Sequence, residues 1–162
     1  MDTNILKLLH DQITLEHESA YAYLIMSAYF EEEGFQGFAK WARKQSEEET
    51  EHMMKIYHYI YDRQADITFS NIQAIPKNWT SVQHAFEDSL KQEQKVTASI
   101  HQILIKAKDT DDFATQDFLQ WFVSEQVEEE ATIHDILHKF SLVGENKAAL
   151  IMLDKDLGER ED

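Results

Sequence analysis

Apolar residues recur at intervals of three and four along four long stretches of the chain, and this spacing limits the fold more than any other feature. It places the apolar side chains on one face of an α-helix. The 162 residues include only 4 Gly and 1 Pro, and the turn-forming clusters fall between the stretches. We therefore predict helices over residues 3–33, 36–64, 81–108 and 111–142.

The links between these helices set their directions. Gly34 and Gly37 lie at the first break and D-T-D-D at 109–112 lies at the last, and such short links make consecutive helices antiparallel. The segment 80–83 has the T-x-x-Q form of a capping box that opens the third helix. The middle link, residues 65–80, can extend to about 50 Å. We expect it to cross the whole bundle, so that helices two and three run parallel.

A short apolar segment follows Gly144 and predicts a fifth, C-terminal helix over about 145–157. Two interpretations remain open: the helix packs on its own bundle, or it makes a subunit contact. The length of 162 residues fits one domain. The prediction is an all-α domain over 1–162, a four-helix bundle over about 3–142 with a long crossover and a short fifth helix.

The charge balance selects among partners. The chain carries 31 acidic and 15 basic side chains, a net charge of −16, so a nucleic-acid backbone or an anionic membrane would repel it. Ala148 to Leu153 is the longest purely apolar run and is far shorter than a bilayer span. Without cysteine there is no disulfide frame, and the N-terminal residues lack the pattern of a signal peptide. We expect a cytoplasmic protein whose charged partners are cations.

Polar side chains interrupt each predicted core face near its middle. Steps of three and four through helix two run through Phe38, Ala42, Gln45, Glu49, His52, Ile56 and Tyr59. The same walk meets Glu16 in helix one, Glu93 in helix three, and Gln126 and Glu129 in helix four. Glu47 and Glu51 lie off the stripe, so we expect water to solvate them.

The spacing of these residues repeats between the two halves of the chain. Glu16 and Glu49 are 33 residues apart, as are Glu93 and Gln126. Glu49-x-x-His52 and Gln126-x-x-Glu129 share a spacing of three, and the two halves are offset by 77 residues. Both helical hairpins therefore deliver polar groups to one level of the bundle.

Four carboxylates buried together require a counter-charge, because they repel one another and are costly to desolvate. Two divalent ions would balance the charge of −4, and oxygen ligands with an imidazole suit Fe(II), Mn(II) or Zn(II). The absence of thiolates argues against a structural zinc site. Di-iron carboxylate bundles have a Glu on each of two helices and Glu-x-x-His on each of the others. This chain has one such pair, Glu49-x-x-His52, and a Gln-x-x-Glu variant in the fourth helix.

Three segments resemble the ferritin family, and more closely the non-haem ferritins of bacteria: M-S-A-Y-F, E-E-E-T-E-H and F-L-Q-W-F-V-S-E-Q-V-E-E-E. The resemblance implies a ferroxidase that oxidises Fe(II) with O₂ or H₂O₂ at an intrasubunit di-iron centre. It also implies storage and detoxification of iron as an Fe(III) mineral inside a homo-oligomeric cage of 24 subunits. No haem is expected, because Gln126-x-x-Glu129 replaces a second Glu-x-x-His.

The resemblance also assigns roles to particular residues. Glu16, Glu49 and His52 would surround one iron, and Glu49 would bridge to a second iron bound by Glu93 and Glu129, with Gln126 nearby. A possible third iron site would use Glu48, Glu125 and Glu128, with Glu129 shared. Tyr23 would contact the centre and donate an electron, and Trp121 is a further candidate. We expect the remaining histidines to be surface or packing residues.

Other classes of protein fit parts of the pattern. Another di-iron carboxylate oxidase or peroxidase would use the same ligands, although a rubrerythrin-like peroxidase needs a Cys-rich iron domain that this sequence lacks. A DNA-protecting mini-ferritin lacks the fifth helix and builds its site between subunits. A metal-free acidic helical interaction module would use its buried polar residues to fix helix register.

Overall fold

The computed structural model describes residues 1–160, which form five helices and no strand. Their bounds are α1 Thr3–Glu32, α2 Gln36–Asp62, α3 Val82–Asp109, α4 Phe113–Val143 and α5 Lys147–Gly158. The predicted bounds agree with these to within two residues at each end. The all-α fold, a four-helix bundle with a long crossover and a short fifth helix, is confirmed.

Local backbone chemistry sets the helix ends. The side chains of Asp2, Asp112 and Asn146 accept backbone N–H groups at the starts of α1, α4 and α5. The predicted capping box at the start of α3 was wrong by one residue. Ser81 is the N-cap and its hydroxyl accepts from the backbone N of His84 at 3.1 Å, while His84 Nδ1 accepts from the backbone N of Thr80 at 3.2 Å. An imidazole thus takes the place expected for the Gln side chain.

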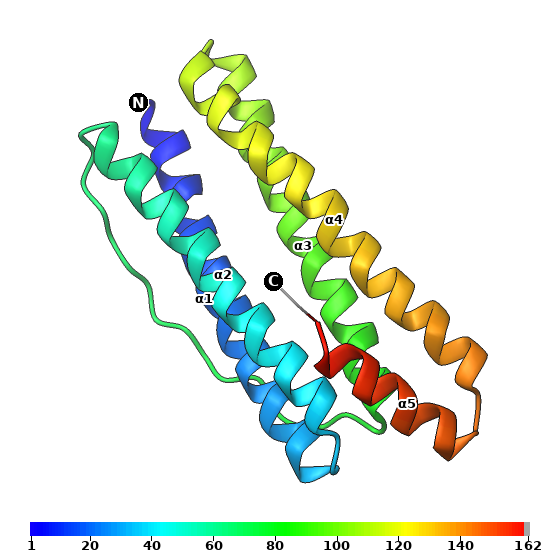
Figure 1. Cartoon of the computed structure of the whole chain (residues 1–162). Coiled ribbons are helices and arrows are strands. Elements are labelled where there is room, and N and C mark those ends of the chain that lie inside the picture. Colours follow the sequence, from blue (N-terminus) through cyan, green and yellow to red (C-terminus); the bar gives the residue numbers. More distant parts are fainter. Residues whose placement is uncertain (161–162) are drawn as a thin grey trace.

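The helices form two antiparallel pairs, α1 with α2 and α3 with α4 (Figure 1). The crossover runs along the outside of the α1/α2 pair from one end of the bundle to the other, so α2 and α3 are parallel as predicted (Figure 1). Trp79 holds its far end: the side chain is buried and Nε1 donates to Asp88 Oδ2 at 3.0 Å. Among residues 1–160, no helix is long and apolar enough to cross a membrane.

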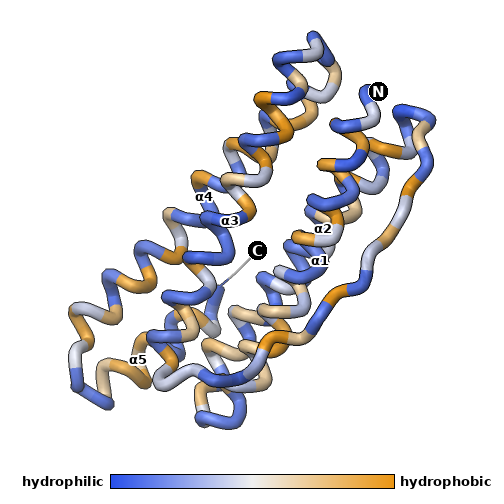
Figure 2. The backbone as a smooth tube through the Cα atoms, turned by 180° about the vertical axis from the view of Figure 1, so that it is seen from behind, coloured by the Kyte–Doolittle hydropathy of each residue, from blue (hydrophilic) through white to orange (hydrophobic). Residues whose placement is uncertain are grey.

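Two hydrophobic clusters fill the bundle, one toward each end. One includes Phe30, Phe38 and Phe86, and the other includes Leu9, Ile56 and Ile100. Hydrophobic and hydrophilic residues alternate along each helix (Figure 2), as expected for helices that bury one face. Most of the buried polar residues lie between these two clusters along each helix, with apolar packing on both sides: Glu16, Gln45, Glu49, His52, Ser89, Glu93, Gln126 and Glu129.

Helix α5 packs across α2 and α4 through its buried Leu153 and Leu157. Asp154 Oδ1 accepts from the backbone N of Phe38 at 2.8 Å and so satisfies a free donor at the start of α2. Gly37 is required here, since a Cβ at this position would lie 1.7 Å from the backbone O of Asp154. The interpretation that α5 packs on its own bundle is confirmed.

Candidate metal centre

All six residues of the predicted di-metal site are buried at one level of the bundle, and every long helix contributes at least one of them: Glu16, Glu49, His52, Glu93, Gln126 and Glu129. Glu16 and Glu93 are fully inaccessible and Glu49 is 1% exposed. Glu47 and Glu51, from the same acidic run, are exposed as predicted. The register of α2 therefore separates inward carboxylates from solvated ones.

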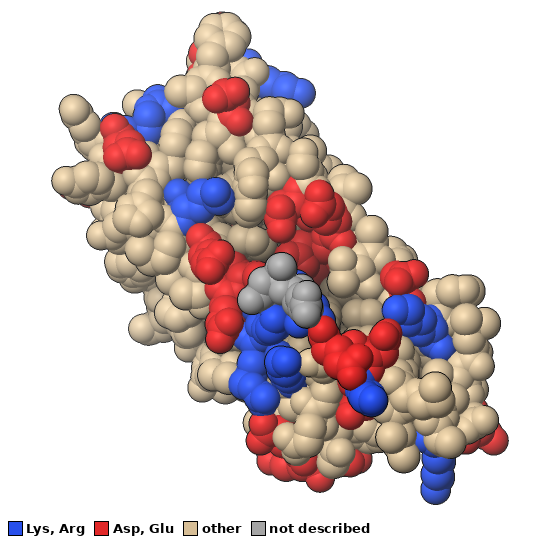
Figure 3. Space-filling model, in the orientation of Figure 1, with Lys and Arg blue, Asp and Glu red and all other residues tan. Residues whose placement is uncertain are grey.

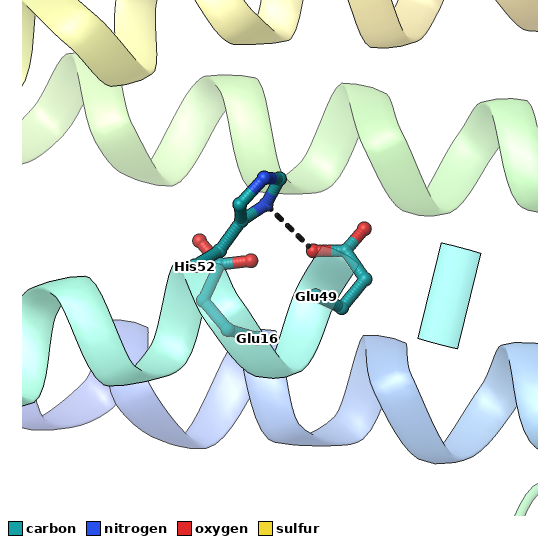
Figure 4. A group of neighbouring side chains, drawn as sticks. All are labelled: Glu16, Glu49 and His52. Carbon is teal, nitrogen blue, oxygen red and sulfur yellow. Dashed lines mark hydrogen bonds and ion pairs between the residues drawn. The ribbon is translucent and has the colours of Figure 1, made fainter. Parts of the chain in front are cut away.

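Glu16, Glu49 and His52 form one group of potential ligands. Each offers one ligand atom, and these atoms all lie within 4.8 Å of one another. Figure 4 shows the three side chains, Glu16 from α1 and the other two from α2, turned toward one another. His52 Nδ1 lies 3.1 Å from Glu49 Oε2. The His52 ring packs edge-on against Trp121, with ring centroids 5.3 Å apart, which limits its rotation.

Glu93 reaches the centre from α3, and two neighbours orient its carboxylate. The hydroxyl of Tyr23 donates to Glu93 Oε1 at 2.6 Å. The amide Nε2 of Gln126 lies 3.2 Å from Glu93 Oε2 and donates to it. Tyr23 thus contacts the predicted centre, and Gln126 acts in this structure as a donor to a carboxylate.

Glu129 closes the centre from α4. Gln45 Nε2 donates to Glu129 Oε2 at 3.0 Å. A second group of potential ligand atoms joins Glu129 to His52 and Glu125, again within 4.8 Å of one another. His52 is therefore common to both groups, which makes the two groups adjacent.

The three residues predicted for a third site are not gathered into one ligand group within residues 1–160. Glu125 is partly buried and belongs to the group with His52, Glu128 is exposed, and Glu48 pairs with Arg160. The charges of Glu128 and Glu48 nevertheless contribute to raising the pKa of Glu125, after its burial. These carboxylates therefore lie near enough to influence one another.

Burial controls the protonation of the centre. It raises the pKa of Glu16 to about 7 and, with the charge of Glu93 second, the pKa of Glu129 to about 8. Burial and then the charges of Glu93 and Glu16 raise the pKa of Glu49 well above its usual value. Burial lowers the pKa of His52 to about 4, so its ring is neutral at pH 7. Without metal, the centre therefore holds protons on its carboxylates.

Two carboxylate oxygens at the middle of this group have no hydrogen-bond donor among the described residues, Glu16 Oε2 and Glu49 Oε1. A buried acceptor without a donor costs about 1–3 kcal/mol. A divalent cation between these oxygens would supply the missing partner and the counter-charge together. A neutral imidazole beside hard carboxylate oxygens suits Fe(II), Mn(II) or Zn(II).

Metal binding should release protons, because the ligands bind metal as carboxylates. At pH 6.5, below the pKa of about 7 for Glu16 and about 8 for Glu129, both groups hold protons that a metal must displace. We expect Zn(II) binding at pH 6.5 to release more than one proton per chain, from Glu16 and Glu129 together with Glu49, whose pKa is also raised, and to release fewer protons at pH 8.5. Calorimetry in buffers of different ionisation enthalpy measures this number. Proton release that stays constant from pH 6.5 to 8.5 would contradict these shifts.

Four contacts at the centre involve residues to which the sequence assigned no role: Gln12, Gln45, Thr97 and Arg160. Gln12 Nε2 donates to Glu16 Oε1 at 2.7 Å, and Gln126 Nε2 lies 3.2 Å from Thr97 Oγ1. Gln45 was a visible signal, since it is a polar residue on the core stripe of helix two. Gln12 and Thr97 lie one turn from a ligand on their own helices, and Arg160 follows α5, so only the fold brings it near.

Seven other histidines occur, and each is exposed or partly exposed: His10, His17, His58, His84, His101, His134 and His138. Trp121 is 39% exposed, and Lys55 Nζ lies 4.2 Å from its ring centroid. The aromatic ring therefore contacts both His52 and a surface lysine. These placements leave His52 as the one buried histidine among residues 1–160.

Known proteins are similar to this chain in sequence and in fold. A model of the ferritin-like domain matches residues 6–143. A bacterial non-heme ferritin of Staphylococcus aureus is 39% identical over 160 residues, which cover 99% of this chain and 96% of that protein. A probable bacterial non-heme ferritin-like protein of Haemophilus influenzae is 35% identical over 158 residues, with 98% and 96% covered.

Solved structures agree with this likeness. An open pore ferritin from the hyperthermophilic archaeon Archaeoglobus fulgidus superposes with a TM-score of 0.97 at 41% identity, and the match covers 99% of each chain. The domain match, the relatives and the superposition all extend across the four helices that carry the buried carboxylates. The chain belongs to the ferritin family.

Proposed function

We propose that this protein stores and detoxifies iron as a ferroxidase, oxidising Fe(II) with O₂ at a pair of adjacent sites within one subunit. Iron is here the substrate, and the Fe(III) product is held as a mineral inside a shell of 24 subunits in the cytoplasm. Membership of the ferritin family supports iron storage in general. The residue assignments and the shell are part of the proposal.

The observation that carries this proposal is the buried acidic layer with unpaired oxygens at its centre. A metal-free interaction module needs each buried polar group paired within the protein, whereas Glu16 Oε2 and Glu49 Oε1 lack a donor among the described residues. Burial of the same layer also raises the pKa of each of its four carboxyl groups: Glu16, Glu49, Glu93 and Glu129. Without a cation, the layer must take up protons to remain buried, whereas a bound cation supplies the counter-charge directly.

We assign the ligands to two ions according to their positions. We assign Glu16, Glu49 and His52 to one ion, and Glu49, Glu93 and Glu129 to the other, with Gln126 holding Glu93. Binding displaces the carboxyl protons, and the resulting anionic ligands favour Fe(III) over Fe(II). A pair of ions lets two Fe(II) deliver two electrons to one O₂. Outside the pair, we assign Glu48, Glu125 and Glu128 to a third ion, with Glu129 shared.

Exposed apolar side chains on α4 and α5 support the proposal that subunits assemble into a shell. Leu142 in α4 and Ile151 and Met152 in α5 are 74%, 64% and 72% exposed. Ile151 and Met152 lie on α5 away from its buried Leu153 and Leu157, and exposed apolar surfaces of this kind mark contacts between proteins. We assign them to subunit contacts, in addition to the intramolecular packing of α5.

Tyr23 provides a test of the residue roles. Tyr23→Phe removes the donor to Glu93 Oε1, so we expect metal stoichiometry to be retained while single-turnover Fe(II) oxidation slows by roughly tenfold, the effect of losing one charge-assisted hydrogen bond. Stopped-flow absorbance after mixing with O₂ measures the rate. Tyr21→Phe is the matched control, because Tyr21 is on the same helix and 37% exposed. Equal Fe(II) oxidation rates in Tyr23→Phe and Tyr21→Phe would show that the Tyr23 hydroxyl has no role in the reaction.

The proposed function is tested by anaerobic titration with Fe(II), followed by addition of O₂ and sizing of the native particle. We expect two tightly bound Fe(II) per chain, rapid oxidation and a particle of 24 chains that retains Fe(III). A monomeric species, or Fe(II) that oxidises no faster than in buffer alone, would overturn the proposal.

A further inference from the structure

The chain that follows α5 returns across α2 and brings a basic side chain to the rim of the acidic layer. Lys40 Nζ donates to the carbonyl O of Gly158 at 2.9 Å, and Lys44 Nζ donates to the carbonyl O of Arg160 at 3.0 Å. Basic and acidic side chains gather side by side on this face of the molecule (Figure 3). Two lysines of α2 therefore fix the backbone from which the Arg160 side chain extends.

The guanidinium of Arg160 donates hydrogen bonds to two residues of α2 that are one helical turn apart. Nη1 donates to Gln45 Oε1 and Nη2 donates to Glu48 Oε1. The side chains of Arg160 and Glu48 are 27% and 33% exposed. A partly buried, charge-assisted contact of this kind is stronger than an ion pair in open solvent. The planar fork of arginine matches both acceptors at once.

Gln45 links Arg160 to the candidate metal centre through two hydrogen bonds. Its side-chain oxygen accepts from Arg160, so its amide Nε2 faces the centre and donates to Glu129 Oε2 at 3.0 Å. Gln45 is 1% exposed. Arg160 thus determines which end of the Gln45 amide faces Glu129 and, through it, the orientation of a proposed ligand.

We propose that Arg160 is a positioning residue of the metal centre, a tethered cation that a divalent ion must displace in order to bind Glu48. The inference rests on the proposed function and adds a competitor from within the chain for the outer carboxylates. While Arg160 is in place, it neutralises Glu48 and holds Glu129 through Gln45. When a divalent ion takes Glu48, Gln45 is released to rotate and Glu129 loses a fixed donor. Arg160 therefore couples occupancy of the outer carboxylates to the geometry of the inner pair.

Zn(II) binding to the assembled, metal-free full-length protein tests this inference, with calorimetry and equilibrium dialysis as readouts. In Arg160→Ala we expect the weaker binding step, outside the two tight equivalents, to strengthen by roughly tenfold, the effect of one charge-assisted contact. Arg160→Lys should restore most of the wild-type value, because it keeps the charge. The double variant Arg160→Ala/Glu48→Gln should lose the gain. Lys155→Ala is the control, because Lys155 is 78% exposed on α5 and pairs with Glu159.

The outcomes separate this inference from the proposed function. Absence of the two tight equivalents in the wild type overturns the proposed function, and the effect of Arg160→Ala on the weaker step is read independently of them. An unchanged weaker step in Arg160→Ala, or a gain that persists in the double variant, overturns the inference while the two tight equivalents stand.

Discussion

Replacing Glu49 with glutamine is expected to abolish rapid Fe(II) oxidation while making the metal-free protein more stable. The substitution removes the charge and the ligand that we assign to both ions, so the oxidation rate should fall by on the order of 100-fold. Burial raises the pKa of Glu49 well above its ordinary value, so the folded protein holds a proton there more tightly than the unfolded chain does. An amide needs no proton. We expect the unfolding free energy of the metal-free protein to be higher in Glu49→Gln than in the wild type at pH 7.

The pH dependence of this stability gain tests its cause. Because the folded-state pKa of Glu49 is raised, the wild type is penalised as the pH rises above 4.5, and the advantage of Glu49→Gln should vanish below that pH. Denaturant unfolding of metal-free protein at pH 4 and pH 7 measures this. Glu47→Gln makes the same charge change at an exposed site two residues away and should alter neither stability nor oxidation. A Glu49→Gln protein that is less stable at pH 7, or that oxidises Fe(II) normally, would contradict this account.

Gly37→Ala should cause a large loss of stability. Its Cβ would lie 1.7 Å from the backbone O of Asp154 and 2.5 Å from its carbonyl C, and backbone atoms cannot move aside as a side chain can. Helix α5 must shift, so Asp154 no longer accepts from the backbone N of Phe38. We expect a loss of about 3 kcal/mol or more in unfolding free energy and weakened assembly, measured by thermal unfolding and native sizing.

Gly34→Ala is the matched control, since the turn between α1 and α2 has space for a methyl group. Nothing lies within 4 Å of its added Cβ, although its φ of +88° disfavours any side chain, and the expected cost is about 1 kcal/mol. The difference between the two variants isolates the close approach of α5. Equal losses would show that backbone conformation alone explains both glycines.

Helix register was the part of the fold and of the site that could be read from sequence. The stripe from Phe38 through Glu49 and His52 to Ile56 is buried throughout, and Tyr59, at its end, is partly buried. Spacing of three and four fixes which side chains share a face whatever the helix packs against. The repeat of 77 residues then matched the levels of the two hairpins, and the buried polar layer lies where that repeat placed it.

The contacts that orient the candidate ligands could not be predicted in the same way. Arg160 is 112 residues from Glu48 and follows a short helix whose crossing of α2 depends on Gly37 and Asp154. Likewise, the capping box was misplaced because Ser81 and Thr80 are both good N-caps, and only the surrounding packing decides which one begins the helix. Periodicity determines the face of one helix, whereas these contacts depend on the relative placement of two.

Anomalous X-ray diffraction from crystals of this protein loaded anaerobically with Fe(II) tests the central claim most directly. The account predicts two iron peaks in the buried layer of each subunit, one among Glu16, Glu49 and His52, and one reached by Glu49, Glu93 and Glu129. Iron peaks found only on the protein surface, or a buried layer whose carboxylates bind no iron at saturating Fe(II), would contradict it.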